Sequence, residues 1–150
     1  MLSMIAALTA ILDTCALVIS GADGACVRQA RLTFAMCRHA VVDLAQVFSA
    51  APESGNTDRL PPPDLQRVRS TLATAGLNLH DTPESRKKLA TLRGMYEPYI
   101  QALSKYLYMD LPPWILAKEI ADNWKTSAWG RISGLTGGSR SDPLLDDHSD

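Results

Sequence analysis

Residues 25–50 carry the pattern that most restricts how this chain can fold. Apolar side chains recur there at alternating steps of three and four residues, and they are Val27, Ala30, Phe34, Cys37, Val41, Leu44 and Phe48. Such a stripe, held over about three heptads, lets a long helix pack nearly parallel or antiparallel to a neighbour. The break at 20–24 is short, so we expect an antiparallel partner in the segment before it.

That preceding segment, 3–19, predicts a helix that is apolar around most of its circumference, as is typical of a central helix. The first Lys or Arg is Arg28, whereas a signal peptide begins with positive charge. Asp13 lies in the middle, where a membrane span would have to bury its charge. We therefore expect a buried core helix and no membrane span. Asp23 is the expected N-cap of the next helix.

The rest of the chain predicts further helices and no strand. A loop over 52–63 ends in three prolines, and a helix is expected over 64–74. Thr82 and Pro83 begin a helix expected over 83–108, with a kink or split near Glu97 because Pro98 removes a backbone hydrogen bond.

The last expected helix covers 114–128, and the glycines and aspartates that follow predict a flexible tail. The predicted fold class is all-α: a mostly antiparallel bundle of about five helices over 1–131, with a disordered acidic C-terminal tail over 132–150. This is an ordinary size for one domain.

Composition argues against two features, which are nucleic-acid binding and a disulfide framework. The net charge of −1 gives no general attraction to nucleic acid, so we expect no nucleic-acid partner. The cysteine count is three, with no CxxC, which favours reduced thiols and a cytoplasmic location over a disulfide framework.

No motif predicts a catalytic or cofactor-binding residue, and no cofactor is expected. His39 and Asp43 are four residues apart on one helical face, a spacing that metal sites use, and Asp13 and Cys37 are conceivable partners. No HExxH motif supports a metal site. The structural interpretation is that Asp13 bonds to a basic group such as Arg38 or His39. The alternative function is a small helical metal-binding protein or enzyme using Asp13, His39 and Asp43.

Two other groups have a structural and a functional interpretation. Basic residues cluster at 86–88 together with Arg93, which indicates a solvated face or contact with anions. The aromatic group that includes Tyr96, Tyr99 and Trp114 could fill the core or line a ligand pocket.

The runs LTAILDTCALVI at 8–19 and RQARLTFAMCRHAVVDLAQVF at 28–48 resemble the cytoplasmic C-terminal domain of bacterial two-transmembrane, potassium-channel-like proteins. The resemblance implies an intracellular helical domain attached to an ion-channel pore and involved in assembly or gating. The sequence has no filter motif of the TVGYG kind, so no filter residue can be assigned to it.

We therefore expect a non-enzymatic cytosolic interaction or regulatory domain, associated with a membrane only through a partner or a pore domain in a longer relative. The heptad stripes could serve a homo-oligomer, a dimer before a tetramer, although packing within one chain is their default explanation. The residues expected to form the interaction surface are Phe34, Val41, Leu44, Tyr96 and Tyr99.

Overall fold

A computed structural model of the chain describes residues 2–53 and 58–115, and every described element is helical. The elements are α1 (Leu2–Gly21), α2 (Ala25–Val47), α3 (Pro62–Thr74), α4 (Pro83–Gly94) and α5 (Glu97–Leu107). The all-α prediction is confirmed. The fifth expected helix, over 114–128, the domain boundary at 131 and the acidic tail lie outside the described residues, apart from Trp114 and Ile115, which are not helical.

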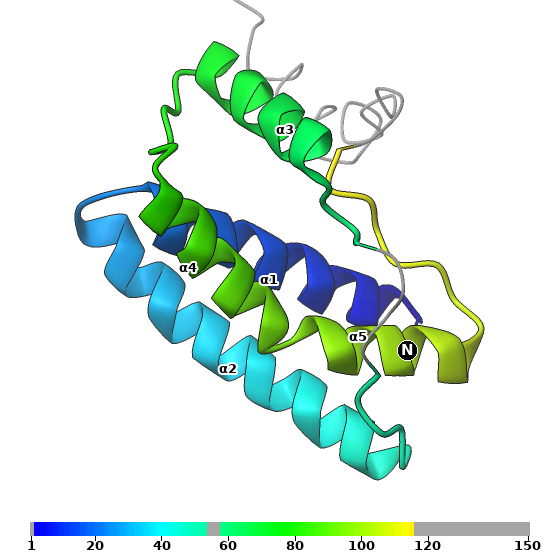
Figure 1. Cartoon of the computed structure of the whole chain (residues 1–150). Coiled ribbons are helices and arrows are strands. Elements are labelled where there is room, and N and C mark those ends of the chain that lie inside the picture. Colours follow the sequence, from blue (N-terminus) through cyan, green and yellow to red (C-terminus); the bar gives the residue numbers. More distant parts are fainter. Residues whose placement is uncertain (1, 54–57, 116–150) are drawn as a thin grey trace, which may run out of the picture. The chain divides into compact units, whose positions relative to one another are not determined.

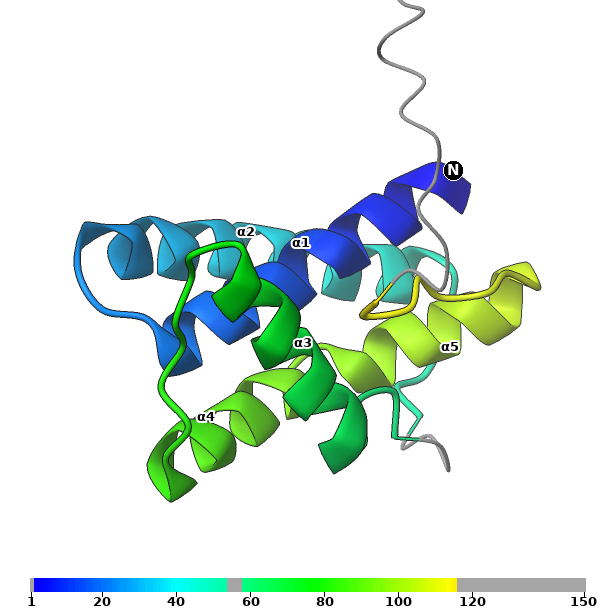
Figure 2. The same ribbon diagram turned by 90° about the horizontal axis from the view of Figure 1, so that it is seen from above.

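The helices α1, α2, α4 and α5 form a mostly antiparallel bundle, in which α1 contacts each of the other three (Figure 1). The helix α2 packs against α1 in the opposite direction, as the short break between them predicted. The helix α4 packs on α1, and α5 follows α4 and contacts both α2 and α1. The helix α3 lies apart from these four, across α1 and α4 (Figure 2).

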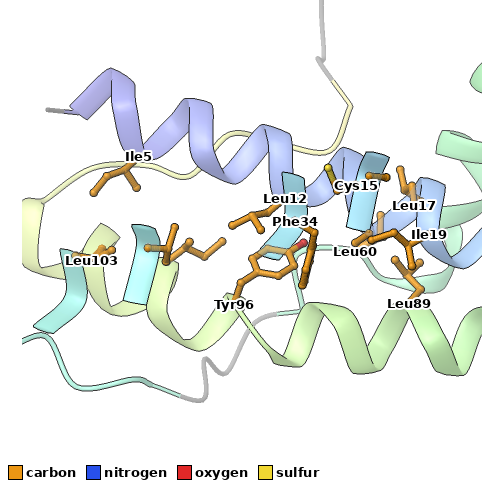
Figure 3. Close-up of a cluster of buried hydrophobic side chains, with 14 of the residues drawn as sticks. Ile5, Leu12, Cys15, Leu17, Ile19, Phe34, Leu60, Leu89, Tyr96 and Leu103 are labelled. Carbon is orange, nitrogen blue, oxygen red and sulfur yellow. The ribbon is translucent and has the colours of Figure 1, made fainter. Parts of the chain in front are cut away.

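The inner stripe of α2 faces the core as its spacing predicted. Phe34 and Val41 are buried, and Ala30 and Ala45 are buried beside them. The ring of Phe34 meets that of Tyr96 edge to face, with ring centroids 5.8 Å apart. In Figure 3 these two rings lie next to Leu12 of α1, so this contact joins α1, α2 and the start of α5.

The expected interaction residues are thus mostly core residues of this chain. Phe34, Val41 and Tyr96 are buried, and Leu44 and Tyr99 are partly buried against the same core. The heptad stripes accordingly pack within one chain, which was the default explanation of their spacing.

Two of the predicted helix boundaries follow from local chemistry. The helix expected over 83–108 is split at Met95 and Tyr96, and Pro98 lies in the first turn of α5, where its missing N–H costs nothing. The expected cap Thr82 accepts a hydrogen bond from Ser85 N at 3.1 Å, while Ser85 Oγ accepts one from Thr82 N at 3.1 Å. This capping box fixes the start of α4.

The predicted cap of α2 was wrong. The N-cap is Gly24, with φ of 91°, and it makes no side-chain hydrogen bond. Asp23 instead pairs with His80, with 2.6 Å between Oδ2 and Nε2. The Asp23 carboxylate thus pairs with a residue distant in sequence, and it does not cap the N-terminus of α2 as the sequence predicted. The helix also ends at Val47 rather than near residue 50.

The stretch Met4–Gly21 of α1, with a mean hydropathy of 1.9, is long and apolar enough to cross a membrane by length and composition. In this structure α1 contacts α2, α4 and α5, and Ile5, Leu12 and Ala16 are fully buried among them. Here the helix therefore serves as the central element that the sequence predicted.

The capping box can be tested by stability. The change Thr82→Ala removes the acceptor for Ser85 N, and we expect it to lower the free energy of unfolding by about 1 kcal/mol. Thr91→Ala is the matched control, because the exposed Thr91 hydroxyl donates only to Lys87 O within the same helix. Urea unfolding followed by circular dichroism measures both, and equal losses in the two variants would contradict the role of the cap.

Candidate functional site

The most distinctive polar feature of the molecule is a buried charged cluster built on Asp13. Asp13 lies on α1, and only 6% of the residue is exposed. Arg59, from the segment just before α3, donates from Nη1 to Oδ1 at 3.2 Å and from Nη2 to Oδ2 at 2.8 Å. A two-pronged pairing of this kind offsets the cost of removing both charges from water far better than a single contact does.

Tyr96 completes the shell around Asp13. Its hydroxyl donates to Oδ1 at 2.5 Å, and the residue is fully buried between α4 and α5. Burial, followed by the adjacent Asp13 charge, raises the pKa of Tyr96 well above its ordinary value. The phenol therefore remains a donor at any physiological pH, and both Asp13 oxygens have partners.

The cluster extends from Arg59 along α4 and α5. Glu97 Oε1 lies 3.5 Å from Arg59 Nη1 and accepts a hydrogen bond from Arg93 Nε at 2.9 Å. Arg93 Nη2 donates in turn to Asp58 Oδ1 at 2.6 Å. Two arginines thus alternate with three carboxylates, counting Asp13, and join α1, α4, α5 and the segment before α3.

The pKa values within the cluster reflect this arrangement. Burial raises the pKa of Glu97, even though Arg93 and Arg59 favour its ionised form. Partial burial opposes ionisation of Asp58, but the hydrogen bonds from Arg93 and from Leu60 N prevail and lower its pKa. Glu97 is therefore more readily protonated than Asp58 as pH falls.

The segment that follows α5 returns to this cluster. Arg59 Nη2 donates to the carbonyl oxygen of Pro112 at 2.9 Å. The guanidinium carbons of Arg59 and Arg93 lie 5.8 Å and 5.7 Å from the centroid of the Trp114 ring, within the range of cation–π attraction. The charged cluster (Asp13, Asp58, Arg59, Arg93 and Glu97, with Tyr96) therefore also holds the end of the described chain against α1.

The sequence predicted a basic partner for Asp13 but named the wrong one. Arg38 donates instead to the carbonyl oxygen of Met95 at 3.0 Å, and His39 is exposed on α2. Arg59 lies in a loop with no periodicity and 46 residues from Asp13, so no spacing rule could find it. The sequence offered only a general signal for this pair. Asp13 needed a basic partner, and Arg59 is one of several arginines that could supply it.

The three side chains considered as metal ligands, Asp13, His39 and Asp43, do not form one site. Asp13 is buried on α1, while His39 and Asp43 are exposed on α2. Within residues 2–53 and 58–115, no three His, Cys, Asp or Glu side chains are placed to hold a metal ion. Cys15, Cys26 and Cys37 are free thiols, and burial raises the pKa of Cys15 and of Cys37, which makes both less reactive.

The basic group at 86–88 is also partly neutralised. Asp81 pairs with both Arg69 and Arg86, and these bonds lower the pKa of Asp81. Arg93, which the sequence analysis added to this basic group, belongs to the charged cluster. Lys87 and Lys88 remain on the exposed surface of α4.

We expect Asp13→Asn to lower the free energy of unfolding by about 3 kcal/mol, because it leaves the buried Arg59 guanidinium short of a counter-charge. Double substitution Asp13→Leu with Arg59→Met removes both charges and should recover much of that loss. Urea unfolding of Asp13→Leu, of Arg59→Met and of the double variant gives the coupling free energy between the two side chains. Additive losses would show that the pair contributes nothing specific.

Glu97 makes a separate prediction about pH. Because its pKa is raised by folding, its contribution to stability is fully present below about pH 4.5, the ordinary value, and is lost as pH rises through the raised value. Glu97→Gln cannot gain a proton, so wild type should gain stability relative to this variant as pH falls from 7 toward 4. Paired urea unfolding curves across that range measure the difference, and a difference independent of pH would contradict the assignment.

No protein-family model, curated protein or solved structure matches this chain. The resemblance of residues 8–48 to channel-like proteins thus gains no support from these comparisons and stays a prediction.

Proposed function

We propose that this chain is a non-enzymatic interaction domain that binds a second copy of itself through the outer face of α2. This outer face consists of Leu32, Met36, His39, Asp43 and Val47, and it lies opposite the buried stripe. Leu32, Met36 and Val47 expose 60%, 75% and 76% of their surface. Isolated exposed apolar residues are ordinary, but three of them along one face of one helix are a reason to expect a partner.

The spacing of the outer face supports a helical partner. Leu32 and Met36 are four residues apart, and Asp43 and Val47 repeat that step eleven residues further along. Positions related in this way form one continuous strip on a helix. The helix α2 can therefore pack on its own core along one side and on a partner helix along the other.

The charges of α2 favour antiparallel self-pairing. Arg28 and Arg31 lie in its N-terminal half, whereas its C-terminal half carries Asp43 and Arg38, whose Nε donates to Met95 O and which is not part of the outer face. A two-fold axis across the helix brings the basic half of each copy beside the acidic position of the other. A parallel arrangement would place like charges together. This asymmetry supports a dimer.

A non-enzymatic role is supported by the state of the polar groups. In the charged cluster both oxygens of Asp13 accept hydrogen bonds, and Glu97 and Asp58 are bonded to Arg93. A metal ion or a substrate could use these carboxylates only by displacing an arginine that is itself mostly buried. The metal-binding alternative thus has weaker support than the interaction role.

The identity of the wider assembly rests on resemblance alone. The similarity of residues 8–48 to channel-like proteins supports a cytoplasmic, regulatory or assembly role next to a membrane pore. We retain this as part of the proposal for longer relatives of the chain.

The self-association is tested by Met36→Glu, which places a carboxylate in the centre of the outer face. We expect wild type to show twice the monomer mass by light scattering on a sizing column, and Met36→Glu to weaken self-association roughly tenfold or more. Met95→Glu is the control, because Met95 is 42% exposed but lies at the junction of α4 and α5. A wild type that stays monomeric at high concentration, or a control that dissociates equally, would contradict the proposal.

A further inference from the structure

The helix α3 is unusual because its backbone does not closely approach that of any other described helix. Its Cα atoms stay more than 8 Å from those of every other described helix, whereas packed helices have axes 8–10 Å apart. Val68 is its only side chain classed as buried, with Leu65 and Leu72 partly buried on the same stripe. Figure 2 shows α3 crossing α1 and α4.

Both ends of α3 are nevertheless fixed to α1. Before it, Arg59 is bonded to Asp13, and Leu60 is buried in the core. After it, His80 N donates to Gly21 O at 2.7 Å. The approach there is so close that a Cβ added at Gly21 would come within 2.9 Å of Leu79 Cβ. The helix is thus held over α1 by its two flanking segments together with the apolar stripe of Val68, Leu65 and Leu72.

The space between α3 and α1 is an apolar cavity of about 290 Å³. Its walls come from α1, from α3, from the segment after α3 and from the end of the described chain, and they include Ala10, Leu17, Leu72, Leu77, Leu79 and Trp114. The volume is roughly twice that of an engineered apolar cavity of about 150 Å³ that stays dry and binds benzene.

Most polar side-chain atoms in the walls already have partners among the described residues. The Asp13 carboxylate accepts bonds from Arg59 and Tyr96, and Thr14 Oγ1 donates to Ala10 O at 2.8 Å. The exception is Trp114 Nε1, a buried donor with no acceptor there, so the walls offer at most one hydrogen bond to a ligand. A charged molecule, or one with several polar groups, would therefore lose most of its hydration without compensation. An uncharged molecule loses little and removes apolar wall from water.

We infer that the cavity between α1 and α3 is a binding site for a small, uncharged, largely hydrocarbon molecule about the size of two fused aromatic rings. The site is independent of the outer face of α2, so it is a function in addition to self-association. The charged cluster forms the polar end of the cavity and excludes anions, since Asp13 adds negative charge there. The two anchored segments keep α3 in place while the ligand fills the gap beneath it.

The probe is 1-fluoronaphthalene, observed by fluorine NMR during titration of the full chain. We expect a saturable shift of the fluorine resonance with wild type, and at least about tenfold weaker binding with Ala10→Leu, whose larger side chain occupies part of the cavity. Ala10 is exposed on α1, so the replacement leaves the core intact.

Ala7→Leu is the matched control, because Ala7 is also exposed on α1 but does not line the cavity. It should bind the probe as wild type does. The inference is overturned if wild type shows no saturable shift, if Ala10→Leu binds with wild-type affinity, or if Ala7→Leu is weakened as much as Ala10→Leu. Circular dichroism of both variants confirms that each comparison is made on folded protein.

Discussion

The pairing of Asp13 with Arg59 is the interaction on which the rest of the structure depends. An apolar central helix that carries one carboxylate can be buried only if that charge is matched, because an unpaired buried charge costs several kcal/mol. Here the match requires three segments to converge on α1: the residues before α3, the junction of α4 and α5 through Tyr96, and the stretch after α5 through Pro112. One acid thus organises connections that apolar packing would leave free.

Local chemistry made much of the helical framework predictable. The buried stripe of α2, the Thr82 cap and the break caused by Pro98 each depend on residues within a few positions of one another. The charged cluster could be predicted only in kind. Asp13, Arg59 and Tyr96 are brought together by tertiary packing, and Arg59 and Asp23 show that distant groups displace the local partners that a sequence suggests. The described residues contain five helices because the helix expected over 83–108 is split in two, while the helix expected over 114–128 lies largely outside those residues.

The structure also distinguishes the core-facing side of α2 from its outer face, whereas the sequence analysis assigned the interaction surface to the core-facing side. The heptad positions expected to contact a partner form the core, and the outer face of α2 is left with Leu32, Met36 and Val47. His39 and Asp43, first considered as metal ligands, lie on that outer face. The cavity under α3 belongs to the other side of α1, where polar bonds of the flanking segments and the buried stripe of α3 hold the chain. The proposed self-association and the proposed ligand site can therefore vary independently.

The most direct test of this account is native-state hydrogen exchange, followed by mass spectrometry, on wild type and on Arg59→Met. If the charged cluster anchors α3, loss of the guanidinium should speed exchange over Pro62–Thr74 and over 108–115 more than over α2. Exchange that rises equally in all helices, or that does not change in α3, would show that the Asp13–Arg59 pair is not what holds these segments on α1.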